Sequence, residues 1–290
     1  MSRPLSMSSW SARWRSRRSR GLALAMPAVA LLTCLFIFPV ANLLSKSFLE
    51  PHLGLQNYTE LLLSSTYRQI LRNTFEVSTI VTLVTLALGF PLAWLLAVIS
   101  RSWAIAIFSV LILSMWTNLL TRTFAWMVLL QSTGLINRSL LAIGLIHTPL
   151  PLTNNLFGVT IGMTYIMLPF IVFPLYATMR AVDSDLLRAA SLCGASPLQC
   201  FFYVFLPQCL PGIAAGCLMV FVMSLGYFVT PALLGGPSYM MIAEMIVQLI
   251  QSMLNWGLGG AAAFVLFCIT LLLYVVQMRF FDPLSGPEQE

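Results

Sequence analysis

The chain has 290 residues, of which 59% are hydrophobic and only 8% are charged. Because an ordinary soluble domain is about 25% charged, so few charges argue against a soluble globular protein and favour a membrane protein. The net charge of +6 is concentrated near the start of the chain. There, six arginines precede the first apolar run: Arg3, Arg13, Arg15, Arg17, Arg18 and Arg20.

Residues 1–21 form a basic arm. Such an arm can bind nucleic acid, but beside a membrane span it is explained more simply by retention in the cytoplasm and contact with anionic lipid. We therefore expect the lipid bilayer as its partner, and no nucleic acid. The triplet Ala28–Ala30 has the A-x-A form of a cleavage site, yet the apolar run continues to Leu44. Since a signal h-region of about 7–15 residues ends at its cleavage site, we expect an uncleaved first helix.

Six segments are apolar enough to cross a membrane, because a span needs about 20 mostly apolar residues. The predicted spans are 22–44, 76–99, 104–126, 156–179, 209–233 and 258–280. Prolines interrupt nearly every span, which a helical bundle tolerates because neighbouring helices satisfy the freed carbonyl groups. The sequence thus predicts an all-α polytopic membrane protein, with a transmembrane domain over 22–280 and a cytoplasmic tail over 281–290.

Lysine and arginine set the expected orientation, because short cytoplasmic loops carry an excess of both. With the N-terminus inside, the cytoplasmic segments hold the arm together with Arg101, Arg180, Arg188 and Arg279. The external segments hold Lys46, Arg68, Arg72, Arg122 and Arg138. The balance, chiefly the arm, predicts that both termini are cytoplasmic.

The longest cytoplasmic connection, 181–208, has the start and stop signals of two short helices. Asp183 or Ser184 can cap the first helix, and Gly194 can end it in a left-handed conformation. The second helix carries three matching signals: Ser196 as its cap, Pro197 at its first position and Gln199 for a capping box. We expect a compact helix–turn–helix on the cytoplasmic face.

One side of the first of these helices carries small residues. Leu187, Ala190 and Gly194 share it by i, i+3 and i+4 spacing, which lets another backbone approach closely. A simple amphipathic connector between two spans is the alternative.

Two strings in this connection resemble the E-A-A-x-x-x-G…I-x-L-P loop of bacterial ABC importer permeases: Arg188–Gly194 and Val204–Pro207. In that family the first helix docks into a groove on the cytoplasmic ATPase and transmits its closure. The resemblance implies these ATPase-coupling residues: Asp185, Leu187, Arg188, Ala189, Ala190, Gly194, Ala195, Pro197, Leu206 and Pro207. Arg188 stands where the family usually has glutamate, which reverses the local charge.

Further strings resemble the spermidine/putrescine branch of these permeases. They are Asn73-Thr74-Phe75 with residues 89–94, then residues 121–126, and residues 226–236. The similarity covers roughly residues 22–280. Tyr227 occupies a position where the branch often has a carboxylate, although a tyrosine ring can still face a cation.

Two groups of residues are candidates for the lining of a solute path. Asn118, Arg122 and Trp126 lie on one face of the third span by i, i+4 and i+8 spacing, and an arginine at membrane depth normally faces protein or water. The alternative is an interfacial anchor. Ser224, Tyr227 and Pro231 share a face of the fifth span, for which helix packing is the alternative. The full candidate set is Asn118, Arg122, Trp126, Ser224, Tyr227 and Thr230.

The resemblance implies a type I ABC importer permease that moves a small solute into the cytoplasm by alternating access. A polyamine such as spermidine or putrescine is the expected solute, and another small cationic or organic solute is the alternative. The expected partners are a cytoplasmic ATP-binding subunit, present as a dimer, a second homologous permease subunit and a periplasmic solute-binding protein. The bacterial inner membrane is the expected location.

No catalytic site is expected on this chain. It has no GxxxxGK[ST] string, so ATP and Mg are expected on the partner ATPase and no cofactor on this chain. Its six cysteines form no CxxC pair, so we expect no metal site. A secondary transporter or a membrane enzyme are the alternative functions. They would place acids, histidines or a catalytic constellation within the spans, and none of the acids or histidines falls at the middle of a predicted span.

Overall fold

The computed structural model describes residues 26–50 and 52–281, and all regular secondary structure in these two ranges is helical. The predicted basic arm, the first residues of the first span and most of the predicted tail lie outside the described residues. Six helices are long and apolar enough to cross a membrane. They are Met26–Leu49, Ser65–Val98, Leu119–Ala142, Leu156–Ala181, Pro197–Leu225 and Trp256–Gln277. The predicted all-α class and the number of spans are therefore confirmed.

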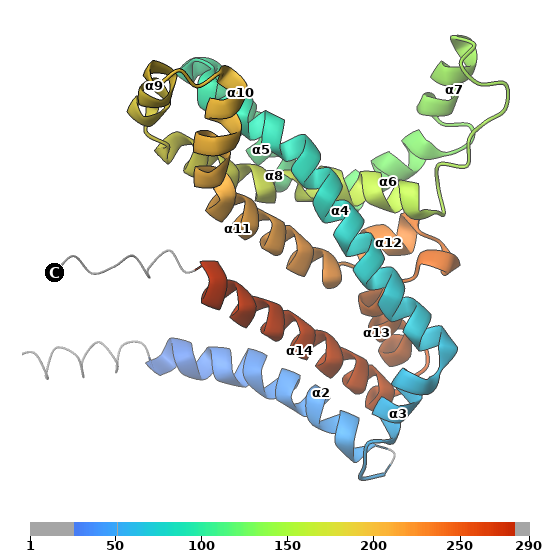
Figure 1. The fold of residues 1–290 in the computed structure, drawn as a ribbon. Coiled ribbons are helices and arrows are strands. Elements are labelled where there is room, and N and C mark those ends of the chain that lie inside the picture. The colour runs from blue at the N-terminus through green and yellow to red at the C-terminus, as the bar shows by residue number, and fades with distance from the viewer. Residues whose placement is uncertain (1–25, 51, 282–290) are drawn as a thin grey trace, which may run out of the picture.

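The core consists of three long helices that pack against one another: α4 (Ser65–Val98), α8 (Leu156–Ala181) and α11 (Leu206–Leu225) (Figure 1). Their facing side chains are fully buried, including Val77, Met163, Ile171 and Val220. Gly89 of α4 sits so close to α8 that a Cβ atom there would lie 2.5 Å from the Ile171 side chain. Small residues of this kind let membrane helices approach closely, so the core is tightly packed.

A second pair of helices lies beside this core. The π-helical turn η1 (Thr33–Ile37) and α2 (Phe38–Leu49) run alongside α14 (Trp256–Phe281) (Figure 1). The short helices α3 (Gln56–Leu63) and α13 (Ile242–Gln251) tie this pair to the start of α4. Asn57 of α3 donates to the carbonyl oxygen of Ser47 at 2.9 Å. The side chains of Met26–Leu49 are almost all exposed, which suits a helix surrounded by lipid.

The predicted third span, 104–126, is wrong as a single helix. The structure divides it into α5 (Arg101–Trp116) and α6 (Leu119–Leu130), which α7 (Leu135–Ala142) follows. The break lies at Thr117–Asn118, where the Asn118 side chain accepts hydrogen bonds from the N–H groups of Leu120 and Thr121. A side chain that caps a new helix in this way ends the preceding one, which hydropathy alone does not reveal.

The predicted fifth span, 209–233, is also broken. Helix α11 ends at Leu225, and a shorter helix, α12 (Val229–Leu234), begins after Gly226–Phe228 and is followed by η3 (Pro237–Tyr239). Pro231 explains the break, because a proline ring clashes with the carbonyl group four residues earlier, here that of Tyr227. The predicted shared face of Ser224, Tyr227 and Pro231 therefore does not form.

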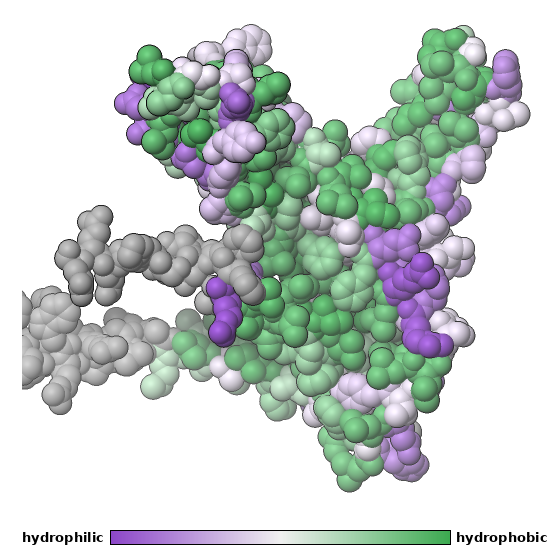
Figure 2. Space-filling model, in the orientation of Figure 1, coloured by the Kyte–Doolittle hydropathy of each residue, from purple (hydrophilic) through white to green (hydrophobic). Residues whose placement is uncertain are grey.

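The surface has the distribution expected of a chain embedded in lipid. Figure 2 shows a largely hydrophobic middle, with polar side chains gathered at the end that carries the segment after α8 and along the opposite edge. The described ends of the chain, Met26 and Phe281, lie at the side of the molecule that carries this segment (Figure 1).

Candidate functional site

The segment after α8 forms the helix–turn–helix that the sequence predicts. Asp183 caps the start of helix α9 (Ser184–Leu192), and its side chain accepts a hydrogen bond from the N–H of Asp185 at 2.9 Å. The turn that follows α9 contains Gly194, which has a left-handed φ of +87°. The N–H of Ala195 donates to the carbonyl oxygen of Ala190 at 3.1 Å, which gives the Schellman arrangement of a helix end. The left-handed glycine is as predicted.

The second helix is not a separate element. Helix α10 (Pro197–Gln199) starts with the predicted capping box between Ser196 and Gln199. It then continues through the π-helical turn η2 (Cys200–Phe205) directly into α11. Leu206 and Pro207 therefore lie inside a continuous helix, at its junction with the membrane core, and α9 is joined to that helix by the Gly194 turn.

Helix α9 projects from the molecule, and none of its residues is buried. Its outward side carries Leu192, which is 89% exposed, together with the charged pair Asp185 and Arg188, and Leu186 is 50% exposed at the edge of that side. Leu198 on α10 is 71% exposed. These three leucines are large apolar side chains that the described part of the chain leaves uncovered.

Two of the predicted coupling residues of α9 face partly inward. Leu187 and Ala190 are half-buried, and Leu187 packs against the membrane core of its own chain. Leu186 and Leu192 are exposed and were not among the predicted coupling residues. Arg188 is exposed and forms an ion pair of 3.0 Å with Asp185, so its charge is partly balanced within α9. Ala189 and Pro197 are exposed, whereas Ala195 is half-buried.

A second candidate site lies where the two broken spans meet. Thr123 of α6 and Thr230 of α12 are both buried, and their hydroxyl oxygens lie 3.4 Å apart. Helix α8 closes the contact from a third side, because a Cβ atom on Gly162 would lie 2.8 Å from the Thr230 methyl group. Discontinuous helices of this kind commonly form solute sites in transporters.

Arg122 and Tyr227 lie beside this junction. The Arg122 Nε atom is buried and has no hydrogen-bond partner among the residues that the structure describes. The phenol of Tyr227 lies close enough to the Thr230 hydroxyl for a hydrogen bond and within range of the Arg122 charge. The break after Leu225 places Tyr227 outside a regular helix, so its backbone as well as its ring is near the junction.

An aromatic pair extends the site. The Trp126 ring packs edge-on against Tyr165 of α8, with ring centroids 5.8 Å apart. The Tyr165 hydroxyl accepts a hydrogen bond of 3.0 Å from Ser114 of α5. Tyr165 is 36% exposed, whereas its neighbour Ile166 is only 4% exposed. Tyr165 was not among the predicted path residues. The sequence does mark it as a polar aromatic residue inside an apolar span.

Two predicted path residues have other surroundings. Asn118 is exposed, and its side-chain oxygen is occupied in capping α6. Ser224 is fully buried within the core, and its hydroxyl has no partner within the described part of the chain. The structure thus brings together Arg122, Tyr227 and Thr230, with Trp126 one helical turn after Arg122 on α6. Asn118 caps α6, and the carbonyl oxygen of Ser224 accepts a hydrogen bond from the N–H of Tyr227 at 3.2 Å.

Glu244 has a carboxylate oxygen, Oε2, that is buried and has no hydrogen-bond partner in the described part of the chain. Glu244 in α13, outside the six candidate spans, is half-buried. Burial raises the pKa of its carboxyl group, and a hydrogen bond with the backbone of Met241 lowers the pKa by less. Because a carboxylate three residues into a helix serves the free N–H groups of the first turn, Glu244 is engaged in part by α13 itself.

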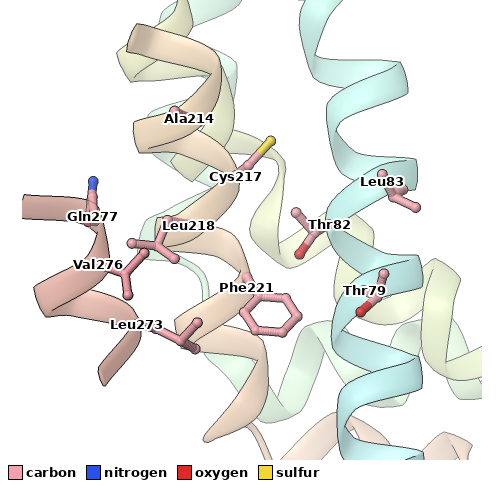
Figure 3. A pocket seen from close by; sticks show the side chains of 10 residues that line it. All are labelled: Thr79, Thr82, Leu83, Ala214, Cys217, Leu218, Phe221, Leu273, Val276 and Gln277. Carbon is pink, nitrogen blue, oxygen red and sulfur yellow. The ribbon is translucent and has the colours of Figure 1, made fainter. Parts of the chain in front are cut away.

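An open hollow of about 340 Å³ lies between α4, α11 and α14 (Figure 3). Its side chains are mostly apolar, including Leu218, Phe221 and Leu273. The hydroxyl groups of Thr79 and Thr82 donate to carbonyl groups of their own helix. Of the side chains that Figure 3 labels, Gln277 and Cys217 have no such bond, and a thiol is only weakly polar, so this hollow suits hydrocarbon rather than a charged solute.

Six apolar helices, a projecting helix at one end and two broken spans around a polar junction define a multi-pass transport permease. The chain matches the family described as binding-protein-dependent transport system inner membrane component over residues 5–284. This chain belongs to that family, the inner-membrane permease subunits of ABC importers, which confirms the resemblance of its loop.

The chain is also similar to individual permeases of this family. The chain is 36% identical over 233 residues to the spermidine/putrescine transport system permease protein PotB of Escherichia coli (strain K12), covering 80% of this chain and 84% of that protein. It is 34% identical over 225 residues to the protein of the same name from Haemophilus influenzae, covering 78% of each. The fold is similar to that of a bacterial ABC transporter for the acidic polysaccharide alginate, with a TM-score of 0.74 and 19% identity over 95% of this chain and all of that one.

Proposed function

We propose that this permease moves a polyamine such as spermidine or putrescine into the cytoplasm, and that a separate ATPase drives it through α9. The observation that supports the proposal is the exposed face of α9, on which Leu192 is 89% exposed, on a helix whose two ends are fixed by hydrogen bonds. A linker between two spans has no need of such a surface. A dimer of ATP-binding subunits, with their ATP and Mg, would bind it.

The connection from α9 to the solute site is continuous. Force applied to α9 passes through the Gly194 turn into α10, and then along η2 into α11. The far end of α11 is the break before Tyr227, next to Arg122 and Thr230. Closure of the ATPase would therefore move α11 as a lever and change the junction at its other end, which is the alternating access that an importer requires.

The aromatic side chains at the junction suit a polyamine. Trp126, Tyr165 and Tyr227 are aromatic, and a ring face that the solute reaches attracts an ammonium group by about 0.5–2 kcal/mol. Arg122 repels the same cation. A path must bind its solute weakly enough to release it, so a repelling charge beside the rings favours passage over retention. A periplasmic solute-binding protein would supply the affinity, and a second permease subunit the other half of the path.

A second candidate solute is a small organic molecule that carries an anionic group. The buried, unpartnered Nε of Arg122 favours it, together with Tyr227 in place of the usual carboxylate. Uptake experiments separate the two candidates. If the permease carries polyamines, a labelled polyamine is taken up and an excess of the anionic molecule does not compete; if it carries the anionic molecule, that molecule is taken up and polyamines do not compete.

The test is uptake by the complete transporter reconstituted in proteoliposomes. We expect ATP-dependent accumulation of radiolabelled spermidine or putrescine when the binding protein is present, and none when this chain is left out. Accumulation without ATP would overturn the ATPase-driven mechanism and favour a secondary transporter. Accumulation of neither polyamine, with ATP hydrolysis stimulated by another solute, would overturn the polyamine assignment alone.

A further inference from the structure

A hollow of about 410 Å³ lies among the ends of α4, α5 and α8 on the side that carries α9. Arg101, the first residue of α5, and Arg180, in the last turn of α8, both line it. The orientation expected from lysine and arginine places this hollow at the cytoplasmic surface of the membrane. It does not belong to the coupling surface or to the junction of the broken spans.

The two arginines lack a compensating charge. Over the described part of the chain only two ion pairs form, Lys46–Glu50 and Asp185–Arg188. The nearest acids in the sequence are already engaged, because Asp183 caps α9 and Asp185 binds Arg188. Both side chains are exposed, and two positive charges that line one hollow favour an anion bound there.

Apart from Tyr176, the other side chains that line the hollow are apolar. Ile105 and Phe108 follow Arg101 on the same face of α5, at i+4 and i+7, and both line the hollow. Phe108 is fixed by Tyr176 of α8, with ring centroids 4.6 Å apart, and by Phe173 at 5.8 Å. A charged rim that continues into an apolar wall matches an amphiphile rather than a free anion.

We propose that this hollow binds an anionic phospholipid, with its headgroup phosphate between Arg101 and Arg180 and an acyl chain along Ile105 and Phe108. Basic pockets between membrane helices on the cytoplasmic side recognise such headgroups. An acidic segment of a partner protein would match the arginines but not the apolar wall. The proposal is independent of which solute the permease carries.

The same lipid would influence coupling. Arg180 also lines a second hollow, of about 780 Å³, which lies beneath α9 and includes Leu187 and Trp94. Helix α8 ends at Ala181, two residues before the Asp183 cap of α9. A phosphate that holds Arg180 therefore fixes the end of α8 from which α9 is suspended.

The test measures lipid retained by the full chain after extraction in mild detergent, by native mass spectrometry, with equal amounts of phosphatidylglycerol and phosphatidylcholine supplied. Wild type should retain phosphatidylglycerol preferentially. The double variant Arg101→Gln/Arg180→Gln should lose this preference by about thirtyfold, or roughly fivefold for each arginine. The matched control, Arg138→Gln/Arg279→Gln, removes the same charge from exposed arginines outside the hollow and should behave as wild type.

Each other outcome counts against the proposal. Equal loss in the two double variants would mean that only net charge matters. Displacement of the lipid by millimolar inorganic phosphate would mean an anion site without a lipid requirement. Unchanged lipid retention with loss of the copurifying ATPase would assign the arginines to an acidic partner surface. If the double glutamine variant is scarce in membranes, Arg101→Lys/Arg180→Lys keeps both charges and should retain the preference, and the single glutamine variants should each lose part of it.

Discussion

Gly194 is the residue on which the joint between α9 and α10 depends. Its φ of +87° lies in the region that a side chain with a Cβ atom disfavours, and no atom of the chain lies within 4 Å of where that Cβ would be. A substitution there is therefore opposed by backbone strain alone and not by crowding.

We expect Gly194→Val to strain the turn by about 1–2 kcal/mol and to reduce ATP hydrolysis stimulated by solute, while membrane abundance stays normal. Gly144→Val is the matched control, because Gly144 also has positive φ and open surroundings but lies in the loop after α7, far along the chain from the coupling segment. Equal loss of stimulated hydrolysis in both variants would show that strain anywhere in the chain has this effect.

Tyr165 distinguishes a solute path from simple packing. We expect Tyr165→Leu and Tyr227→Leu each to lower polyamine uptake severalfold, since a lost cation–π contact is worth about 0.5–2 kcal/mol. Tyr274→Leu removes a half-exposed ring from α14 and should leave uptake unchanged. Initial uptake rates, measured at matched membrane abundance, distinguish a role in the solute path from a role in packing. Wild-type rates in both path variants would leave these rings with a packing role only.

At the scale of elements, the break between α5 and α6 gives Asn118 a testable role. Asn118→Ser keeps an oxygen that can cap α6, whereas Asn118→Leu removes it at a cost of about 1 kcal/mol. We expect the serine variant to match wild type in thermal stability and uptake, and the leucine variant to be lower in both. If Asn118→Ser loses uptake with unchanged stability, the amide instead contacts the solute.

Local chemical signals predicted helix ends well. Asp183, Gly194 and Ser196 occupy the capping positions that their side chains and backbone freedom favour, because capping depends on a few adjacent residues. The two broken spans could not be found from hydropathy, since a break in an apolar segment leaves its average unchanged. Asn118 and Pro231 are the residues that mark the two breaks in the sequence. Neither predicts a break with certainty, because a membrane helix can contain an asparagine or a proline and remain unbroken.

The candidate solute site could be predicted only in part, because it is assembled from four separate helices. Arg122 and Trp126 were found from their spacing along one helix. Tyr165 was missed because its contacts with Trp126 and Ser114 join residues that are distant in the sequence. Ser224 was included because its spacing assumed a helix that the chain does not continue.

At the scale of the whole molecule, α9 and both described ends of the chain lie at one side (Figure 1). We expect this side to be cytoplasmic, because the basic arm resists translocation. In a variant whose other cysteines are replaced by serine, the exposed Cys193 should react with a membrane-impermeant maleimide only after cells are opened. A cysteine introduced at Gly144 should react in intact cells. Labelling of Cys193 in intact cells would reverse the topology.

The central claim is that the exposed face of α9 that carries Leu192 binds the ATPase. Copurification of the ATPase subunit with Leu192→Asp, at matched membrane abundance, tests it most directly. A carboxylate at this 89% exposed position cannot disturb the core, but it would be desolvated in a bound complex, so we predict that the ATPase is lost. Leu53→Asp, at a position 82% exposed and expected on the external side, should retain it. Full recovery of the ATPase with Leu192→Asp would contradict the account.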